Sequence, residues 1–335
     1  MKLCIVRDPA LGIDFGYINK LLPYLSKNMN IVIYDKLSYK TVKEINNLYD
    51  IVNIQYPIKI LKNPILNHFY FLLLFRKIKI KKVITMHGFV TKQSNKFLGL
   101  FAPIYYGLLN STKTIVFSEL QKSVLNQYHV KNIVVIPHGC NDCDYNINDK
   151  KRDVIFFHGF IRKSKGIEIL IKAVKKLIEE KYNLYLKILG NSYKGEESYV
   201  KIIKDLLEKE IPEHYELKIG IHTDEEITRE ASISYIAVLP YIDNFIEVSG
   251  VLHTIMACGT PVIVSNTPRF ISELKNDYNA CIVEPNENAI AEGIKKLITD
   301  YGYWKMLSEN LQKKAVECRW EHIAQMLTEE FNKIK

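Results

Sequence analysis

The sequence predicts an α/β protein made of two doubly wound domains, each with a mostly parallel sheet covered by helices. Three observations support this prediction. The chain has 335 residues, which is longer than the usual single domain. Short apolar runs of strand length alternate with amphipathic helical stretches, as they do in successive βαβ units. A polar segment interrupts this alternation near the middle of the chain, and the same pattern then starts again.

The first domain is expected over residues 1–145, and a polar, turn-rich linker is expected at Asn141–Arg152. The candidate strands of this domain are short apolar runs separated by helical stretches. They are Lys2–Arg7, Asn30–Tyr34, Ile51–Gln55, Val83–Met86, Thr114–Phe117 and Ile133–Ile136.

The second domain is expected over residues 152–315. Its candidate strands are Asp153–His158, Tyr185–Leu189, Glu216–Gly220, Ile236–Pro240, Pro261–Val264 and Ala280–Val283. Between the first two of these, Ile167–Glu180 has apolar residues at helical spacing, which predicts an amphipathic helix. A long helical pattern covers Tyr303–Lys335.

Composition argues against several classes of protein. Hydrophobic residues make up 47% and charged residues 25%, as in an ordinary globular protein, so a disordered chain is not expected. The apolar run at residues 1–6 is too short for a signal peptide, and the longest apolar stretch, Phe69–Phe75, is too short to span a bilayer.

The six cysteines are scattered along the chain, which favours a reducing cytoplasm. The C-x-x-C at Cys140 and Cys143 is interpreted as two loop thiols rather than a zinc or redox site.

The net charge of +9 predicts attraction to an anionic partner, such as nucleic acid, phospholipid headgroups or a phosphorylated substrate. The apolar run Phe69–Phe75 passes directly into the basic run Arg76–Lys82, a combination that suits an anionic membrane surface. A buried helix followed by a strand explains the same residues equally well, so both interpretations are kept.

Cations gather where the first strand of the second domain ends and the next helix begins. The segment His158–Gly166 contains Arg162 and Lys165. Open α/β sheets bind ligands at the carboxyl ends of their strands, and a helix N-terminus flanked by cations suits a phosphate group. We therefore expect Arg162 and Lys165 to bind a diphosphate, with a solvated basic turn as the alternative.

A second segment of this kind follows the strand that ends at Pro240. Its loop carries Glu247, and Ser249 and Gly250 open an apolar helix. Gly250 has no side chain to keep an anionic group away from the backbone N–H groups. A serine N-cap without any ligand is the alternative.

His87 follows a strand of the first domain, so we expect it to face the ligand crevice, with a packed core histidine as the alternative. The first βα turn, Leu11–Gly16, has too few glycines for the dinucleotide fingerprint, and the sequence has no P-loop motif. Binding of NAD or FAD and P-loop ATPase chemistry are therefore disfavoured.

Taken in order, these segments resemble the retaining glycosyltransferases of the GT-B fold, family 4 in the sequence classification. The resemblance rests on Asn132–Gly139, on the Lys-Gly of His158–Gly166, and on the Gly-x-Pro-Val-Ile of Cys258–Ile263. It covers essentially the whole chain and implies two Rossmann-like domains that face each other across a cleft. It further implies that the first domain binds the acceptor, the second binds the nucleotide sugar, and a helix over residues 318–335 packs back on the first.

The resemblance also assigns roles around the diphosphate. It implies that Arg162 and Lys165 hold the diphosphate, and that Gly16 lies in a loop facing its distal phosphate. It also implies that this distal phosphate is held by the backbone amides of Ser249, Gly250 and Val251.

Around the transferred sugar and the ribose, the resemblance is less complete. His87 matches the family histidine beside the sugar, and Glu247 stands near the first of two family glutamates. Thr254 occupies the position of the second glutamate, which binds ribose in the family, and Phe160 stands where many members have an arginine. The incomplete glutamate pair leaves ribose recognition and the register of Glu247 open, and Phe160 leaves Arg162 as a displaced candidate for the family arginine.

The implied reaction transfers a hexose or similar sugar from a nucleoside diphosphate to a hydroxyl of a glycan or lipid-linked glycan, with retention of anomeric configuration. The cations would stabilise the departing diphosphate, so neither a metal nor another cofactor is expected. The alternatives are a catalytically silent nucleotide-sugar-binding subunit and an epimerase or phosphorylase of the same fold. No nucleic-acid partner is expected, and the protein is placed either free in the cytoplasm or peripherally on the cytoplasmic membrane face.

Overall fold

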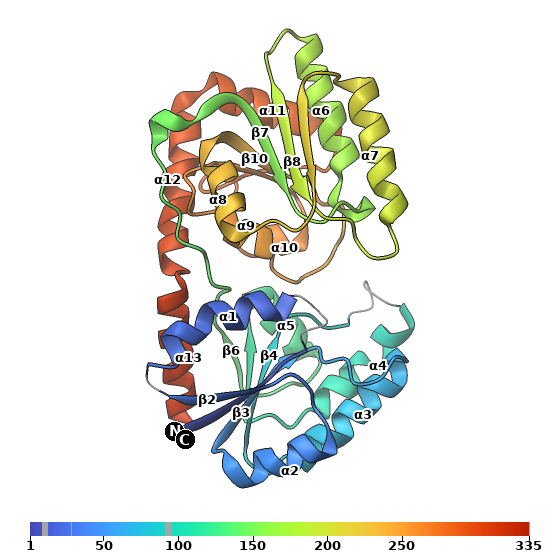
Figure 1. Cartoon of the computed structure of the whole chain (residues 1–335), viewed down its shortest axis with the longest axis vertical. Coiled ribbons are helices and arrows are strands. Elements are labelled where there is room, and N and C mark those ends of the chain that lie inside the picture. Colours follow the sequence, from blue (N-terminus) through green and yellow to red (C-terminus); the bar gives the residue numbers. More distant parts are fainter. Residues whose placement is uncertain (9–12, 28, 91–95, 335) are drawn as a thin grey trace. The chain divides into compact units, whose positions relative to one another are not determined.

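The computed structural model describes residues 1–8, 13–27, 29–90 and 96–334, and it divides into two compact units (Figure 1). Unit 1 consists of Met1–Gly139, Phe245–Val248 and Trp320–Lys335, and unit 2 consists of Cys140–Asn244 and Ser249–Arg319. Each unit contains one parallel sheet of six strands, and every strand expected from the sequence has a counterpart. The predicted α/β class with two doubly wound sheets is therefore confirmed.

The sheet of unit 1 has the order β2-β1-β3-β4-β5-β6. Its strands are β1 (Lys2–Val6), β2 (Asn30–Tyr34), β3 (Ile51–Tyr56), β4 (Lys81–Met86), β5 (Lys113–Val116) and β6 (Ile133–Val135). The helices between them are α1 (Ile13–Leu25), α2 (Tyr39–Leu48), α3 (Pro64–Lys77), α4 (Lys96–Gly107) and α5 (Glu119–Gln127). Strand β3 is buried along its whole length, as expected for a parallel strand covered on both faces.

Helices cover both faces of this sheet. One face packs against α1 and against the last helix of the chain, α13 (Trp320–Lys333), and the other packs against α2, α3, α4 and α5. Local sequence signals start several of these helices: Ser38, Asn63 and Ser118 each accept a hydrogen bond from a backbone N–H of the first turn. Pro64 follows Asn63 at the first helical position of α3, where its missing N–H costs nothing.

The sheet of unit 2 has the order β12-β11-β10-β7-β8-β9. Its strands are β7 (Lys151–His158), β8 (Tyr185–Gly190), β9 (Tyr215–Ile219), β10 (Ser234–Leu239), β11 (Val262–Ser265) and β12 (Cys281–Val283). The longer helices are α6 (Ile167–Glu179), α7 (Glu197–Glu210), α8 (Asp224–Ile233), α11 (Glu287–Thr299) and α12 (Tyr301–Glu317). The short ones are α9 (Gly250–Ile255), α10 (Pro268–Ile271) and the 3-10 turns η2 (Ile147–Asp149) and η3 (Lys163–Lys165).

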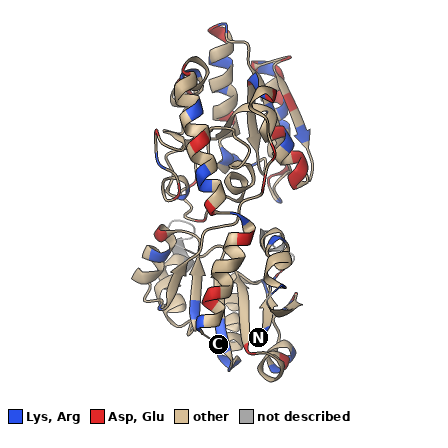
Figure 2. Cartoon of the chain, turned by 90° about the vertical axis from the view of Figure 1, so that its left-hand side faces the viewer, with Lys and Arg blue, Asp and Glu red and all other residues tan. Residues whose placement is uncertain are grey.

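The helical pattern over Tyr303–Lys335 forms two helices rather than one. Helix α12 ends at Glu317 in unit 2, and α13 begins at Trp320 in unit 1. At the break, the backbone oxygen of Cys318 accepts a hydrogen bond from the backbone N–H of Cys140 at 2.6 Å. Figure 2 shows charged residues of both signs on this side of the chain, where Glu330 of α13 pairs with Lys113 at 2.7 Å.

The Phe69–Phe75 run lies in helix α3, which has a buried side and an exposed side. Phe71, Leu72, Leu74 and Phe75 are buried against the sheet, whereas Phe69 and Leu73 are exposed. Among the described residues, no helix is long and apolar enough to cross a membrane.

Candidate functional site

The strand order of unit 2 contains a topological switch point between β7 and β10. From β7 the chain continues outward through β8 to β9, and it returns to β10 on the other side of β7. The loops that leave β7 and β10 at their carboxyl ends therefore run in opposite directions, which opens a crevice between them. These are the loops that carry the candidate donor-binding residues.

The two loops are joined by backbone contacts. Gly166, at the end of the β7 loop, adopts a left-handed φ of +66°, and a Cβ at this position would lie 1.9 Å from the Pro240 carbonyl oxygen. The Ile242 N–H also donates a hydrogen bond to the Ser164 carbonyl oxygen at 3.0 Å. Only glycine fits at position 166, because both the conformation and the close approach exclude a side chain.

Lys165 lies in this junction as a partly buried cation. Its Nζ is 3.5 Å from the centroid of the Tyr241 ring, and Tyr241 itself is fully buried. Burial first, and then the nearby charge of Arg269, lower the pKa of Lys165 to about 7. The Asp243 carboxylate partly opposes this lowering of the pKa, but within the described part of the chain no carboxylate lies within ion-pair distance of Lys165.

Two arginines lie close to Lys165. The Arg269 guanidinium is 5.4 Å from the Tyr241 ring and donates to Asp243 at 2.8 Å. Arg162 packs over the Tyr193 ring at 4.2 Å, and its Nε lies 3.6 Å from Glu196. Both arginines thus have a neighbouring carboxylate, which leaves Lys165 as the cation whose charge is least compensated.

The segment Ser249–Val251 adjoins the same crevice. The Ser249 hydroxyl accepts a hydrogen bond from the Leu252 N–H and caps α9, which is the role that the alternative interpretation gives it. A methyl of Val251 would lie 3.7 Å from a Cβ built on Gly159, at the start of the β7 loop. Thr254 is partly buried, and its hydroxyl donates a hydrogen bond to the Gly250 carbonyl oxygen at 3.0 Å.

In unit 1, His87 follows β4 and is only 9% exposed. It contacts the rings of Tyr17 and Phe117, with centroid separations of 4.9 and 5.1 Å. Burial, together with His138, lowers the pKa of His87 to about 3, so its ring is neutral at physiological pH. We expected His87 to face a ligand crevice, whereas within unit 1 its ring is buried among aromatic rings.

A chain of buried polar side chains on β3 and β4 holds the His87 ring. Gln55 Nε2 donates to Asn53 Oδ1 at 2.5 Å, so Gln55 Oε1 faces His87 Nε2 and accepts its proton at 2.7 Å. Asn53 Oδ1 also accepts a hydrogen bond from the Thr85 hydroxyl. This network keeps the proton on Nε2 of the neutral imidazole.

The remaining predicted residues lie in different places. Glu247 belongs to unit 1, where its Oε1 would lie 3.5 Å from a Cβ built on Gly88, the residue after His87. Gly16 is exposed with open space around it, but it lies inside helix α1 and not in a loop as expected. The earlier part of that βα turn, residues 9–12, lies outside the described residues.

Sequence reasoning missed four residues that the structure brings to these sites. Tyr241 and Arg269 flank Lys165, and Gln55 fixes His87. The Ser164 hydroxyl is buried and has no hydrogen-bond partner among the residues that the structure describes. Tyr241 could have been found, because it directly follows a strand that ends at Pro240. Arg269 and Gln55 carry no local signal.

The cysteine pair and the acidic residues form no metal site in the described part of the chain. Cys140 is buried in the core of unit 2, and Cys143 lies against Cys258, whose thiol hydrogen bond lowers the Cys143 pKa. Asp142 and Asp144 form an Asp-x-Asp in the linker, but Asp142 is largely exposed and pairs with Arg319 at 3.2 Å.

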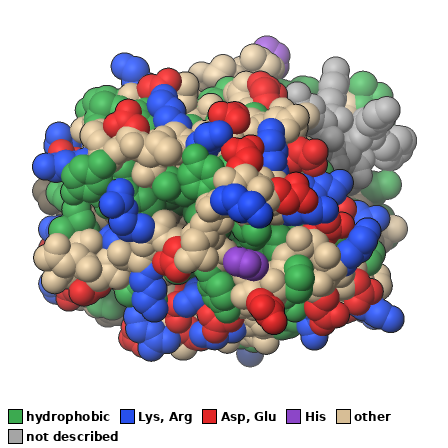
Figure 3. All heavy atoms as spheres, turned by 90° about the horizontal axis from the view of Figure 1, so that it is seen from above, with side chains coloured by type: hydrophobic (Ala, Val, Ile, Leu, Met, Phe, Trp, Pro, Cys, Tyr) green, Lys and Arg blue, Asp and Glu red, His purple; other side chains and the backbone are tan. Residues whose placement is uncertain are grey.

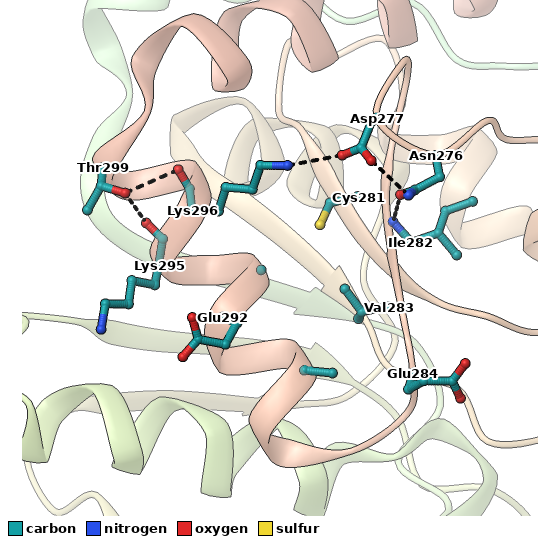
Figure 4. Close-up of a pocket in the computed structure, with 12 residues that line it drawn as sticks. Asn276, Asp277, Cys281, Ile282, Val283, Glu284, Glu292, Lys295, Lys296 and Thr299 are labelled. Carbon is teal, nitrogen blue, oxygen red and sulfur yellow. Dashed lines mark hydrogen bonds and ion pairs between the residues drawn. The ribbon is translucent and has the colours of Figure 1, made fainter.

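A different hollow of about 680 Å³ lies beside the edge strand β12 and helix α11 (Figure 4). Both of its lysines are already paired: Lys296 with Asp277 at 3.1 Å, and Lys295 with Glu180 at 2.8 Å. Charges of both signs are also interspersed over the face shown in Figure 3. Neither surface offers the uncompensated charge found at Lys165.

Comparison with known proteins identifies the family of the chain. The family of glycosyl transferases group 1 matches residues 144–315, which is slightly more than half of the chain. The chain belongs to this family. It is also 26% identical over 244 residues to an uncharacterized glycosyltransferase of Methanocaldococcus jannaschii. That match covers 66% of this chain and 60% of the relative, so it spans less than two thirds of the relative's length.

Solved structures confirm that this member of the family has the GT-B fold. HepE from Anabaena, in complex with UDP, gives a TM-score of 0.80 at 14% identity and covers 99% of both chains. A glycosyltransferase from Rickettsia africae gives 0.75 at 17% identity, over 99% of this chain and 98% of that one. A sucrose-phosphate synthase from Thermosynechococcus elongatus gives 0.76 at 16% identity, over the same shares. At these identities the likeness is one of fold.

Proposed function

We propose that this glycosyl transferases group 1 protein transfers a sugar from a nucleoside diphosphate to a hydroxyl acceptor, with retention of anomeric configuration. One observation carries the proposal. Lys165 is a partly buried cation at the switch point of unit 2, and no carboxylate among the described residues lies within ion-pair distance of it. A diphosphate placed there would compensate its charge and would also reach Arg162 and Arg269.

UDP is the nucleotide to test first, because HepE has been solved with UDP and with UDP-glucose. The buried Ser164 hydroxyl provides a further polar group toward such a ligand. The amides of Ser249, Gly250 and Val251 are proposed to hold the distal phosphate, and Thr254 and Gly16 are proposed to lie near the ribose and that phosphate.

The chemistry proposed for unit 2 is electrostatic. Cleavage of the sugar–phosphate bond leaves negative charge on the diphosphate, and fixed cations in a site shielded from water stabilise that charge. Lys165 and the arginines are proposed to supply it without a divalent ion. Turnover is then expected to persist in excess EDTA.

Unit 1 is proposed to bind the acceptor and to supply the side chains that act on the transferred sugar. His87 is neutral and fixed by Gln55, so its role is to position a sugar hydroxyl rather than to carry a charge. Glu247 lies beside Gly88 and adds a carboxylate to the same loop region.

The acceptor is proposed to be a glycan or a lipid-linked glycan at an anionic membrane surface. Exposed apolar side chains on α3, together with the exposed cations Arg76, Lys77, Lys79 and Lys81, support a peripheral contact. Each cation near such a surface contributes about 1 kcal/mol, which fades as salt shortens the screening length.

A thermal-shift screen with UDP, UDP-glucose and other nucleotide sugars tests the donor site. A ligand at 100 times its dissociation constant stabilises by about 2.7 kcal/mol, and we expect UDP compounds to do so. Product analysis then separates the alternatives. Epimerised or phosphorolysed sugar without an acceptor would indicate an epimerase or phosphorylase, and binding without turnover on any acceptor would indicate a silent subunit.

A further inference from the structure

Unit 1 contains an apolar groove of about 420 Å³ between α3 and α4, which are neighbours in Figure 1. Leu72, Ala102 and Tyr106 are buried and form its floor. Its rim is formed by Phe69 and Ile104, which are 62% and 66% exposed. The side chains along the groove are almost all hydrocarbon, so the groove suits an apolar ligand.

The exposed apolar surface continues beyond the groove along both helices. Helix α3 also exposes Ile65, Leu66 and Leu73, and α4 also exposes Leu100 and Phe101. Contiguous exposed apolar surface of this kind marks a place where a protein contacts a partner or a membrane. We therefore expect an apolar ligand, membrane or protein partner to cover the exposed surface of α3 and α4.

The groove adjoins the loop that carries His87. Val90 lines the groove, three residues after His87, and its N–H donates a hydrogen bond to the Tyr106 hydroxyl at 2.8 Å. The ring of Phe89, between them, packs against Tyr106 with a centroid separation of 6.0 Å. One short segment of backbone thus borders the sugar-positioning histidine on one side and the groove on the other.

The charge of this region indicates what kind of apolar ligand fits. Between Asp50 and Glu119 the sequence has ten Lys and Arg residues and no Asp or Glu. The whole chain has 46 cations and 37 acidic residues, so the rest of the chain carries 36 cations against 37 acids, a net charge of −1. The entire positive excess therefore lies in the segment that contains α3 and α4, and it complements an anionic lipid.

We infer that the groove holds the hydrocarbon chain of a phosphate-bearing lipid acceptor, whose head group then lies beside the His87 loop. This inference rests on the proposed transferase function and adds the class of acceptor. Lys59 and Lys62, both exposed in the segment before α3, are placed to meet the phosphate. A lipid-linked glycan has this combination of groups when a phosphate joins its single prenyl or alkyl chain to the sugar that carries the acceptor hydroxyl.

Binding of octyl, decyl and dodecyl phosphate, each kept below its micelle concentration, tests the inference by calorimetry on the whole chain. Each methylene buried in the groove is expected to raise the affinity about fourfold. The variant Phe69→Ser/Ile104→Ser should lose most of this dependence on chain length. Both residues are mostly exposed, so the variant should fold. Ile221→Ser, at a site 90% exposed in unit 2, is the matched control and should bind like wild type.

Several outcomes would overturn the inference. Affinity that does not depend on chain length would show that only the phosphate is recognised. If the affinity of the groove variant rose with alkyl chain length as it does in wild type, the alkyl chain would have to bind outside the groove. Equal binding of wild type and variant to phosphatidylglycerol vesicles, without alkyl phosphate binding, would leave only surface adhesion. A dimer in sedimentation that the variant abolishes, again without alkyl phosphate binding, would make a second copy the occupant.

The same experiment separates this inference from the proposed function. Alkyl phosphate binding is measured without any nucleotide, whereas UDP binding is measured without any lipid. A groove variant that binds UDP normally but loses the chain-length series supports the groove as the acceptor site. If wild type bound alkyl phosphates with the expected dependence on chain length but did not bind UDP, the groove would be a lipid site in a protein without the proposed transferase function. That result would overturn its role as an acceptor site.

Discussion

In unit 2 the loops at the carboxyl ends of the strands bring cations together, whereas in unit 1 the side chain that follows β4 is kept neutral. Lys165 and Arg269 share the Tyr241 ring, and burial lowers the Lys165 pKa to about 7. His87 instead lies among aromatic rings, and its pKa falls to about 3. One region is built to meet a charged group, and the other to direct a hydrogen bond.

The two regions also differ in what holds them. The unit 2 loops are fixed by backbone, through Gly166 against Pro240 and the hydrogen bond from Ile242 to Ser164. The unit 1 site is fixed by side chains, through the series Thr85, Asn53, Gln55 and His87. Substitutions should therefore damage unit 2 through its main chain and unit 1 through its polar network.

The largest effect is expected from Gly166→Ala. The added methyl would meet the Pro240 carbonyl and would occupy a left-handed conformation, so the free energy of unfolding should fall by about 2 to 5 kcal/mol. UDP binding should be lost with it, because the two loops must separate. Chemical denaturation of wild type and variant measures this, and an unchanged unfolding midpoint would disprove the contact between the loops.

Gln55→Leu should have the next largest effect. It leaves the buried His87 N–H without its acceptor, which costs about 1 to 3 kcal/mol of stability. Turnover should fall while the affinity for UDP stays at the wild-type value, because the network lies in unit 1. Gln55→Glu is the control: it restores an acceptor and should raise the His87 pKa, which NMR titration can follow. Equal activity of Gln55→Leu and wild type would remove Gln55 from the site.

A smaller effect, and a gain in stability, is expected from Gly16→Ala. Gly16 lies within α1, and no residue that the structure describes lies within 4 Å of its Cβ position, so alanine should stabilise the protein by up to about 1 kcal/mol. If Gly16 also approaches a phosphate, the more stable variant will bind UDP-glucose less well. Higher melting temperature with unchanged donor kinetics would leave Gly16 as a helix residue only.

Arg162→Gln should give the smallest loss. Its guanidinium already contacts Tyr193 and Glu196, so a diphosphate gains less from it than from Lys165. We expect less than a tenfold increase in KM for the donor, consistent with a partly exposed ion pair. A loss larger than that of a Lys165 variant would reverse the assignment of the principal cation.

The sequence predicted the strands and the loops that carry the candidate residues, because apolar periodicity and glycine punctuation are local signals. It offered the Ser249 cap as the alternative to a phosphate site, and it treated Tyr303–Lys335 as one helical pattern, which the structure divides near Cys318. It placed Gly16 in a loop, because a glycine in the first turn of a helix looks like part of the preceding turn. Arg269 and Gln55 could not be found, since they reach Lys165 and His87 only through the packing of other strands and helices.

The most direct test of the donor site is UDP calorimetry between pH 6.5 and 9 on wild type and Lys165→Met. Lys165 is positively charged below its pKa of about 7, and a bound diphosphate should raise that pKa. Affinity of wild type should therefore be greatest at low pH and should fall by up to about tenfold per unit as pH rises above 7. Lys165→Met should bind roughly 10- to 150-fold more weakly at pH 6.5, with little further dependence on pH. Equal affinity of the two proteins with the same pH profile would contradict a diphosphate site at Lys165.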